Sequence, residues 1–140
     1  MTSFVLRRKV IIEWGHCDPA GIVFNPRFFE MFDNSTWLLF EAALGVKPKD
    51  ITKTLGFWSF PLVDARANFI KPARFGDVVE IASRVIEFRR SSFDVEHKIF
   101  NGGELATDGR ETRVWAARDK TNPEKIAAIP IPPEVIAKFG

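Results

Sequence analysis

The stretch from Pro26 to Leu44 restricts the fold most, because it predicts one long helix that is apolar over much of its surface. At 1.5 Å per residue such a helix is about 28 Å long, and Gly45 is a typical C-terminal stop. The apolar residues form two neighbouring stripes at helical spacing: Phe28, Phe32, Leu39 and Ala43, and then Phe29, Trp37, Phe40 and Leu44. A helix with so broad an apolar surface must be covered on most of its sides.

Most of the remaining chain shows the two-residue alternation of strands. Asn101-Gly102-Gly103 is a typical hairpin turn, and Asp108-Gly109 suggests a bulge in the strand after it. Strands are expected at 4–14, 63–70, 78–88, 93–99 and 105–118, with a short addition at 126–131 and helical turns within 47–56 and at 134–139. One helix covered by about five antiparallel strands predicts an α+β fold.

Length and composition narrow the class of protein. The 140 residues, 46% of them hydrophobic, fit a single domain over 1–140 with a substantial core. Fourteen Phe and four Trp supply apolar area for a pocket or a subunit contact, so an oligomer is expected. The net charge of +2 gives no argument for nucleic acid. The single cysteine excludes an internal disulfide, and neither a signal peptide nor a membrane-length apolar segment is visible, so we expect a cytoplasmic protein without a membrane partner.

The loop before the long helix is the first candidate site. Asn25 is a typical N-cap and Pro26 suits the first helical position. Free N–H groups in the first turn of a helix can hold a negatively polarised oxygen. Gly21 lets the chain bend, so that Asp18 can return towards those N–H groups. A carboxylate beside an oxyanion site is a layout for acyl transfer, although Asp18 can equally bond its own turn.

Two further side chains invite a functional interpretation. Asp33 lies in an apolar stripe of the helix, one turn from Phe29 and one from Trp37, so its carboxylate needs a partner. That partner is either a polar group of a ligand or an arginine such as Arg66. Cys17 is a second candidate nucleophile, but a lone cysteine near a core is usually inert packing. The two histidines are too few for a metal cluster and no dinucleotide fingerprint is present, so we expect no metal and no cofactor.

Several segments carry a family resemblance: the run His16-Cys17-Asp18-Pro19-Ala20-Gly21-Ile22-Val23-Phe24-Asn25-Pro26, the run Phe29-Glu30-Met31-Phe32-Asp33, and the segments 61–77 and 87–93. Together they cover most of the chain and resemble the 4-hydroxybenzoyl-CoA thioesterase family, which has the hotdog fold. The order of one helix and then long antiparallel strands agrees with that fold. The resemblance implies an acyl-CoA thioesterase.

The resemblance also implies roles for residues of the first run. Asp18 is the catalytic carboxylate, either as a nucleophile through a mixed anhydride or as a base for water, and the backbone N–H of Asn25 is the oxyanion donor. Asp33 matches the position that contacts the 4-hydroxyl of the substrate, and Gly21 and Phe24 are expected to contact the substrate. The family has an aromatic residue in place of Asn25, but a backbone amide keeps its role whatever the side chain.

A coenzyme A site is implied at Arg89, Arg90 and Ser92, which match the turn that meets the phosphates. Two adjacent guanidiniums are suited to phosphates because they form charge-assisted hydrogen bonds. The chain departs from the family pattern at Ser91, where a basic residue is expected, and at His16, where an acidic one is expected. The change at Ser91 removes one of the charges that the family pattern offers to phosphate.

The sequence therefore predicts hydrolysis of a small, aromatic acyl-CoA resembling 4-hydroxybenzoyl-CoA to the free acid and CoA. Family sites of this kind lie between two subunits, so a homodimer is the minimum and a homotetramer is expected. A short-chain aliphatic acyl-CoA or an acyl-carrier-protein thioester is the alternative substrate. A hotdog module that binds acyl-CoA without cleaving it is the alternative outside the enzymes.

Overall fold

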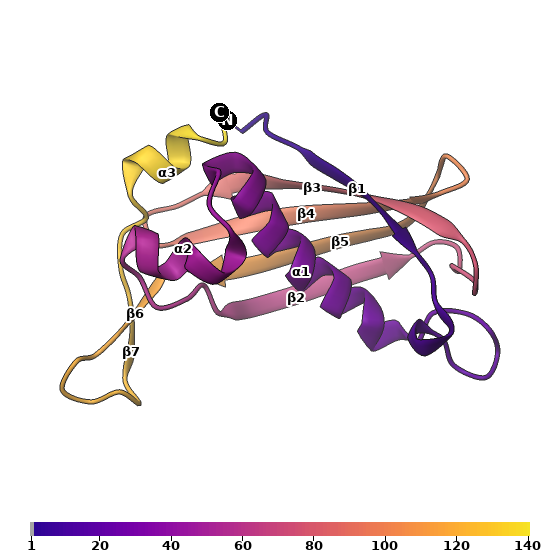
Figure 1. Ribbon diagram of the computed structural model, residues 1–140, viewed down its shortest axis with the longest axis horizontal. Coiled ribbons are helices and arrows are strands. Elements are labelled where there is room, and N and C mark those ends of the chain that lie inside the picture. Colours follow the sequence, from indigo (N-terminus) through magenta and orange to yellow (C-terminus); the bar gives the residue numbers. More distant parts are fainter. Residues whose placement is uncertain (1) are drawn as a thin grey trace.

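The computed structural model describes residues 2–140 and has the long helix α1 (Asn25–Leu44) lying diagonally across one antiparallel sheet (Figure 1). The strands are β1 (Leu6–Ile11), β2 (Leu62–Phe69), β3 (Val78–Phe88), β4 (Ser92–Asn101) and β5 (Glu104–Val114), in the spatial order β1-β3-β4-β5-β2. The expected α+β arrangement, with a five-stranded sheet and one long helix, is confirmed.

Glycines end the first two helices, and a proline begins the last one. Gly45 follows α1 with a φ of 71°, and Gly56 follows α2 (Pro48–Leu55) with a φ of 70°. Such left-handed values suit glycine because it has no Cβ. The last helix, α3 (Pro133–Ala137), begins with proline and lies near α2 at the same end of the molecule as both chain termini (Figure 1).

The first and last strands are shorter than expected. The predicted strand over 4–14 ends at Ile11, and the chain then makes the short 3-10 helix η1 (Trp14–His16). The predicted strand over 105–118 is divided into β5 and β6 (Ala116–Arg118), and β6 pairs with β7 (Ile126–Ala128) as a separate two-stranded sheet.

The prediction of a bulge at Asp108-Gly109 is wrong. Pairing with β2 and β4 continues through both residues, and β5 needs the glycine for another reason. A Cβ on Gly109 would lie 2.5 Å from two ring carbons of Phe32, so the glycine lets α1 approach the sheet closely. The register shifts of the sheet lie elsewhere, within 62–64, 85–87 and 99–100.

The core lies between α1 and the inner faces of β3, β4 and β5. One cluster surrounds Phe40 and Trp115 near the C-terminal half of α1, and a second surrounds Phe32 and Ile81 near its N-terminal half. Strand β2 is different, because almost all of its residues are exposed on both faces. No helix within residues 2–140 is long and apolar enough to cross a membrane.

Candidate active site

The loop that carries Asp18 is a tight hairpin between η1 and α1. The backbone N–H of Asp18 donates to the carbonyl of Ile22 at 3.0 Å, and Gly21 turns the chain with a φ of 78°. One carboxylate oxygen of Asp18, Oδ1, accepts the N–H of Ala20 at 2.8 Å, so the side chain bonds its own turn. Within residues 2–140 the second oxygen, Oδ2, has no hydrogen-bond donor, and the side chain is half-buried.

Asn25 is not the N-cap of α1, because the helix begins at Asn25 itself and Phe24 takes the extended cap conformation without a side-chain cap bond. Phe24 is held there by the hydrogen bond from its N–H to the carbonyl of His16 at 2.9 Å. The next residue, Pro26, has no N–H, and the N–H of Arg27 already donates to the carbonyl of Phe24 at 2.8 Å. The N–H of Asn25 therefore remains without an acceptor in the described part of the chain.

A hollow of about 330 Å³ opens beside this helix start. Its wall is mostly apolar, and Phe28 and Phe69 face each other there with ring centroids 5.4 Å apart. The lining residues are Ile22, Val23, Asn25, Phe28, Phe69, Ile70, Lys71, Pro72 and Ala73. Phe24 lies outside this wall and is 51% exposed, and the carbonyl of Gly21 accepts the N–H of Phe75 at 3.0 Å.

Asp33, on the third turn of α1, pairs with Arg113 of β5 and not with Arg66. The Nη2 group of Arg113 donates to Oδ1 of Asp33 at 2.7 Å, whereas Arg66 pairs with Asp64 at 3.0 Å. The Asp33 side chain is 56% exposed, but that of Arg113 is only 4% exposed. Within the described residues Oδ2 of Asp33 accepts no hydrogen bond.

Behind Arg113 lies a buried polar network that sequence reasoning missed. Arg113 donates to Glu111 at 2.7 Å, and His97 and Thr36 meet the other oxygen of Glu111 at 2.9 and 2.5 Å. The far nitrogen of the His97 ring lies 2.7 Å from the hydroxyl of Ser83. The alternation along β4 and β5 could have revealed this network, because His97, Glu111 and Arg113 occupy positions that face the core.

The ionisation of this network follows from burial and partners. Burial lowers the pKa of His97, and the nearby charge of Arg113 acts in the same direction, so the ring is neutral. Burial alone would raise the pKa of Glu111, but hydrogen bonds from His97 and Arg113 hold it below its usual range. Arg113 therefore faces one ionised buried carboxylate, and its hydrogen bond to Glu111 raises its own pKa against the effect of burial.

The predicted coenzyme A residues lie in the turn between β3 and β4. Arg89 already has partners: its guanidinium donates to Asp94 at 2.6 Å and to Glu87 at 2.8 Å, and its Nε donates to Ser92 at 2.9 Å. Arg90 is exposed, and no side-chain hydrogen bond holds it within residues 2–140. Of the two guanidiniums, only that of Arg90 is open to an added anion.

Asp18 and Arg89 lie at opposite ends of the sheet. The loop with Asp18 follows β1, whose last residue Ile11 pairs with Val78 at the start of β3, whereas Arg89 follows the end of β3. At about 3.4 Å per residue, the eleven residues of β3 separate these ends by roughly 34 Å. One protomer therefore does not bring the two predicted halves of the site together.

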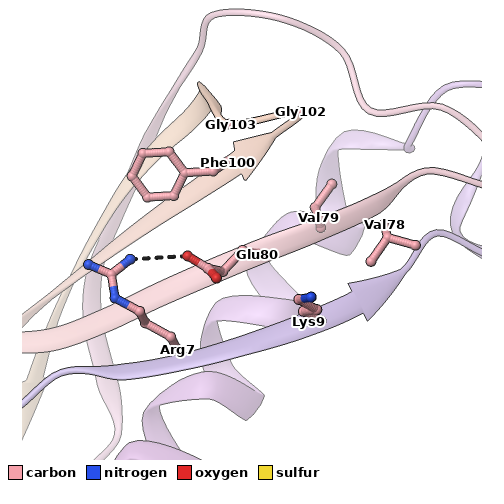
Figure 2. A pocket seen from close by; sticks show the side chains of 8 residues that line it. All are labelled: Arg7, Lys9, Val78, Val79, Glu80, Phe100, Gly102 and Gly103. Atoms are coloured by element: carbon pink, nitrogen blue, oxygen red, sulfur yellow. Dashed lines mark hydrogen bonds and ion pairs between the residues drawn. The ribbon is translucent and has the colours of Figure 1, made fainter.

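Another hollow, of about 460 Å³, lies between β1, β3 and the hairpin of Gly102 and Gly103 (Figure 2). Two cationic side chains, Arg7 and Lys9, reach it from β1, but Arg7 is paired with Glu80 at 3.0 Å. None of the predicted site residues lines this hollow, so it is not part of the candidate active site.

One long helix packed across a five-stranded antiparallel sheet is the arrangement expected for a hotdog-fold protein. Comparison with known proteins agrees. Residues 12–139 match the sequence model of the Thioesterase-like superfamily. The chain is 33% identical over 131 residues to 4-hydroxybenzoyl-CoA thioesterase of Pseudomonas sp. strain CBS-3, covering 89% of this chain and 90% of that one.

Solved structures extend the comparison. The structure of the same Pseudomonas enzyme has a TM-score of 0.86 at 30% identity, covering 97% of this chain and 99% of that one. A mutant of 4-hydroxybenzoyl-CoA thioesterase in complex with 4-hydroxybenzoyl-CoA has a TM-score of 0.88 at 29% identity, covering 99% and 100%. A gentisyl-coenzyme A thioesterase has a TM-score of 0.79 at 28% identity, covering 96% and 98%. The chain belongs to the Thioesterase-like superfamily and is an acyl-CoA thioesterase with the hotdog fold.

Proposed function

We propose that this enzyme hydrolyses the thioester of a small aromatic acyl-CoA, resembling 4-hydroxybenzoyl-CoA, with Asp18 as its catalytic carboxylate. The observation that carries the proposal is the free N–H of Asn25 at the start of α1, close in the chain to the unbonded oxygen of Asp18 and on the wall of an apolar hollow. An amide at the positive end of a helix stabilises the oxyanion that forms when a thioester carbonyl is attacked.

The Asp18 carboxylate can act by either of two routes. As a base, it takes a proton from water while the water oxygen bonds to the carbonyl carbon, and collapse of the tetrahedral oxyanion expels the CoA thiolate. As a nucleophile, it bonds to the carbonyl carbon itself, expels the thiolate and leaves a mixed anhydride that water then cleaves. In both routes the N–H of Asn25 binds the oxyanion. Gly21 and Phe24 hold the loop of Asp18 in shape through the backbone hydrogen bonds of Gly21 with Phe75 and of Phe24 with His16.

Asp18→Asn tests the proposal because it keeps the shape of the side chain and removes its charge. We expect turnover of 4-hydroxybenzoyl-CoA, followed as free thiol, to fall by roughly 10²–10⁴ with the KM little changed. Asp50→Asn is the matched control, since Asp50 is an exposed carboxylate on α2. Normal turnover in Asp18→Asn would refute the role of Asp18. No thiol release by the wild type from any aryl-CoA would refute the aromatic substrate and direct the assay to aliphatic and carrier-protein thioesters.

We propose further that each site is completed by a second subunit. β2 is an edge strand with Val63 and Phe69 59% and 46% exposed, which is the kind of surface that a second copy covers. A two-fold axis that pairs β2 with β2 of the partner reverses the two ends of the sheet. The Arg90 turn of one subunit would then lie at the same end of the strands as Asp18 of the other, which removes the separation along the strands found within one protomer. A tetramer would pair two such dimers.

Subunit mixing tests this arrangement. Asp18→Asn and Arg90→Ala should each be weakly active alone at low acyl-CoA concentration. If Asp18 and Arg90 of one site come from different chains, unfolding and refolding an equal mixture restores one intact site in every mixed dimer. Random pairing then recovers about a quarter of the wild-type rate. A mixture no more active than the mean of its two parents would show that each site lies within one chain.

A further inference from the structure

Arg8, on the face of β1 that packs against α1, is a half-buried cation whose hydrogen bonds go to neutral groups. Its Nε donates to the hydroxyl of Ser35 at 2.8 Å, and its Nη2 donates to the carbonyl of Met31 at 3.1 Å. Burial lowers the pKa of this guanidinium, and no carboxylate within residues 2–140 pairs with it. Charges that are taken out of water are normally paired, so Arg8 is a half-buried charge for which the described chain supplies no counterion.

The neighbouring Arg7 shows the contrast with a balanced arginine. It lies on the opposite face of β1 and pairs with Glu80 at 3.0 Å, and its side chain is 60% exposed (Figure 2). Water and a carboxylate both screen its charge, so an added anion would gain little there. Arg8 differs from Arg7 because it combines burial with neutral partners.

A hollow of about 300 Å³ opens at Arg8, where β1 meets the start of α1. Its lining includes Arg8, Val10, His16, Arg27, Glu30 and Met31. None of these residues lines the hollow beside Asn25 and Phe69, so the two hollows flank the start of α1, one next to β1 and the other next to β2. These strands form the two edges of the sheet (Figure 1). The hollow at Arg8 is therefore separate from the hollow of the candidate active site.

The charges around this hollow leave one positive unit unbalanced. Arg27 and Glu30 cancel, since the Nη1 group of Arg27 lies 3.0 and 3.1 Å from the two carboxylate oxygens of Glu30. The Nδ1 atom of His16 accepts the backbone N–H of Glu13 at 2.9 Å, so the ring proton is on Nε2, which can donate to a ligand. Arg8 supplies the remaining charge, and a ligand with a single negative charge would balance it.

The free donors of Arg8 and the apolar part of the wall favour an organic carboxylate. The Nη1 group of Arg8 has no acceptor within the described residues, and Nη2 has a second N–H, so this edge of the guanidinium can hold both oxygens of a planar carboxylate. Val10 and Met31 offer an apolar surface beside it. The volume is larger than a carboxylate alone fills and lies at the lower end of the range of small-molecule pockets, about 300–1,000 Å³.

We propose that this hollow, called the Arg8 site below, binds a small organic anion with one carboxylate and a short apolar body. The carboxylate pairs with Arg8 and accepts the Nε2 N–H of His16, and the apolar body lies against Val10 and Met31. The acid released from an aromatic thioester belongs to this class of ligand. The inference goes beyond the proposed function, because binding at the Arg8 site requires no hydrolysis.

Calorimetric titration with benzoate tests the requirement for charge. Arg8→Gln removes the charge but keeps a side chain that can donate to Ser35 or Met31, and we expect the Kd for benzoate to rise by about tenfold or more. Arg7→Gln is the matched control, because it removes the same charge one residue away on the outer face, and its Kd should stay within about twofold of the wild type. Benzamide, the neutral analogue, should bind the wild type about tenfold more weakly than benzoate. Equal Kd values in the two variants, or no binding of benzoate by the wild type, would overturn the inference.

A histidine signal shows where benzoate binds. The chain has two histidines and His97 is fully buried, so the ring signals of His16 are readily assigned by NMR spectroscopy. Benzoate should shift the His16 ring signals in the wild type and in Arg7→Gln, but not in Arg8→Gln. A shift of the same size in Arg8→Gln would place benzoate elsewhere near this loop and refute the Arg8 site.

Glu30→Gln changes the charge of the site in the opposite direction. It removes the carboxylate that cancels Arg27, so the Kd for benzoate should fall by about threefold or more. Glu41→Gln is the matched control, because Glu41 is also paired with a cation but lies near the other end of α1. An unchanged Kd in Glu30→Gln would overturn the inference, and this comparison decides alone if Arg8→Gln does not fold.

Two further outcomes separate the Arg8 site from its alternatives. Inorganic phosphate should bind more weakly than benzoate, since it has no apolar body to place against Val10 and Met31, and tighter binding of phosphate would overturn the choice of a carboxylate. The titrations contain no thioester, so they are independent of catalysis. Absence of hydrolysis would refute the proposed function and leave the Arg8 site standing, whereas absence of benzoate binding would refute the Arg8 site alone.

Discussion

Gly109→Ala should destabilise the protein by overpacking the contact between α1 and β5. An ideal Cβ at this position would lie 2.5 Å from two ring carbons of Phe32 and 3.2 Å from a third. Carbon atoms in contact normally lie about 3.5–4.0 Å apart, so the ring or the strand must move by roughly 1 Å. Retreat of the ring is blocked, because Phe32 is fully buried and stacks on His97, which is itself held by hydrogen bonds.

The expected cost follows from two opposing effects. Overpacking a close-packed core costs about 1–3 kcal/mol. Replacing glycine by alanine in a strand returns about 0.5–1 kcal/mol, because the unfolded chain becomes less flexible. The middle of each range leaves a fall of about 1 kcal/mol in the free energy of unfolding, which lowers the Tm of a protein of this size by about 3–5 °C.

Thermal unfolding followed by circular dichroism measures this effect, with all variants at one protomer concentration because assembly shifts the Tm. Gly15→Ala is the matched control, since nothing lies within 4 Å of its Cβ position and its backbone does not require glycine. Phe32→Leu removes ring carbons that the new Cβ would meet, so Gly109→Ala should cost less in that background. A Gly109→Ala protein as stable as the wild type, or an equal cost in both backgrounds, would refute the reasoning.

Two further predictions concern the turn between β3 and β4. Hydrogen bonds from Arg89 and Arg110 hold the pKa of Asp94 well below its usual range despite burial, so Asp94 stabilises the fold at pH values above the unfolded pKa of about 3.9. Asp94→Asn should therefore lower the Tm at pH 7. The difference in Tm between this variant and the wild type should narrow as the pH falls below about 4, and a Tm difference that stays constant with pH would contradict this. Arg90→Ala should raise the KM for CoA esters by about tenfold but leave the KM for a truncated thioester without the nucleotide unchanged, and equal increases would mean that Arg90 does not bind phosphate.

Much of the fold could be predicted because its signals are local. Pro26 and Gly45 mark the ends of α1 to within one residue, and clean alternation locates β4. The exact helix start could not be predicted from capping preference, since the hydrogen bond from Phe24 to His16 fixes the cap. That bond depends on the path of the whole loop and not on the side chain of Asn25.

The partner of Asp33 could not be predicted, because it depends on the register of strands far away in the sequence. Arg113 lies 80 residues from Asp33, whereas Arg66 is nearer in the chain but pairs with Asp64 on its own strand. Arg89 shows a different limit, because its partner Asp94 is only five residues away and the two side chains meet only once the turn has folded back. Local sequence indicates that a charged side chain in an apolar stripe needs a partner, but the fold decides which partner it receives.

The buried network is unlike the aromatic core around it, and this difference argues for a functional origin. Replacing buried ion pairs by apolar residues of similar volume is often neutral or stabilising, so stability alone does not explain Glu111 and Arg113 among so many phenylalanines. The hydrogen-bonded network runs through the buried side chains Ser83, His97, Glu111 and Arg113. It reaches the surface at Asp33, whose side chain is 56% exposed. A costly rigid support that ends at one accessible carboxylate is suited to fix the direction of that carboxylate. Because removal of one partner leaves the other charge buried and unpaired, variants of Glu111 or Arg113 should lower the free energy of unfolding, whereas Asp18→Asn should lower the rate of hydrolysis.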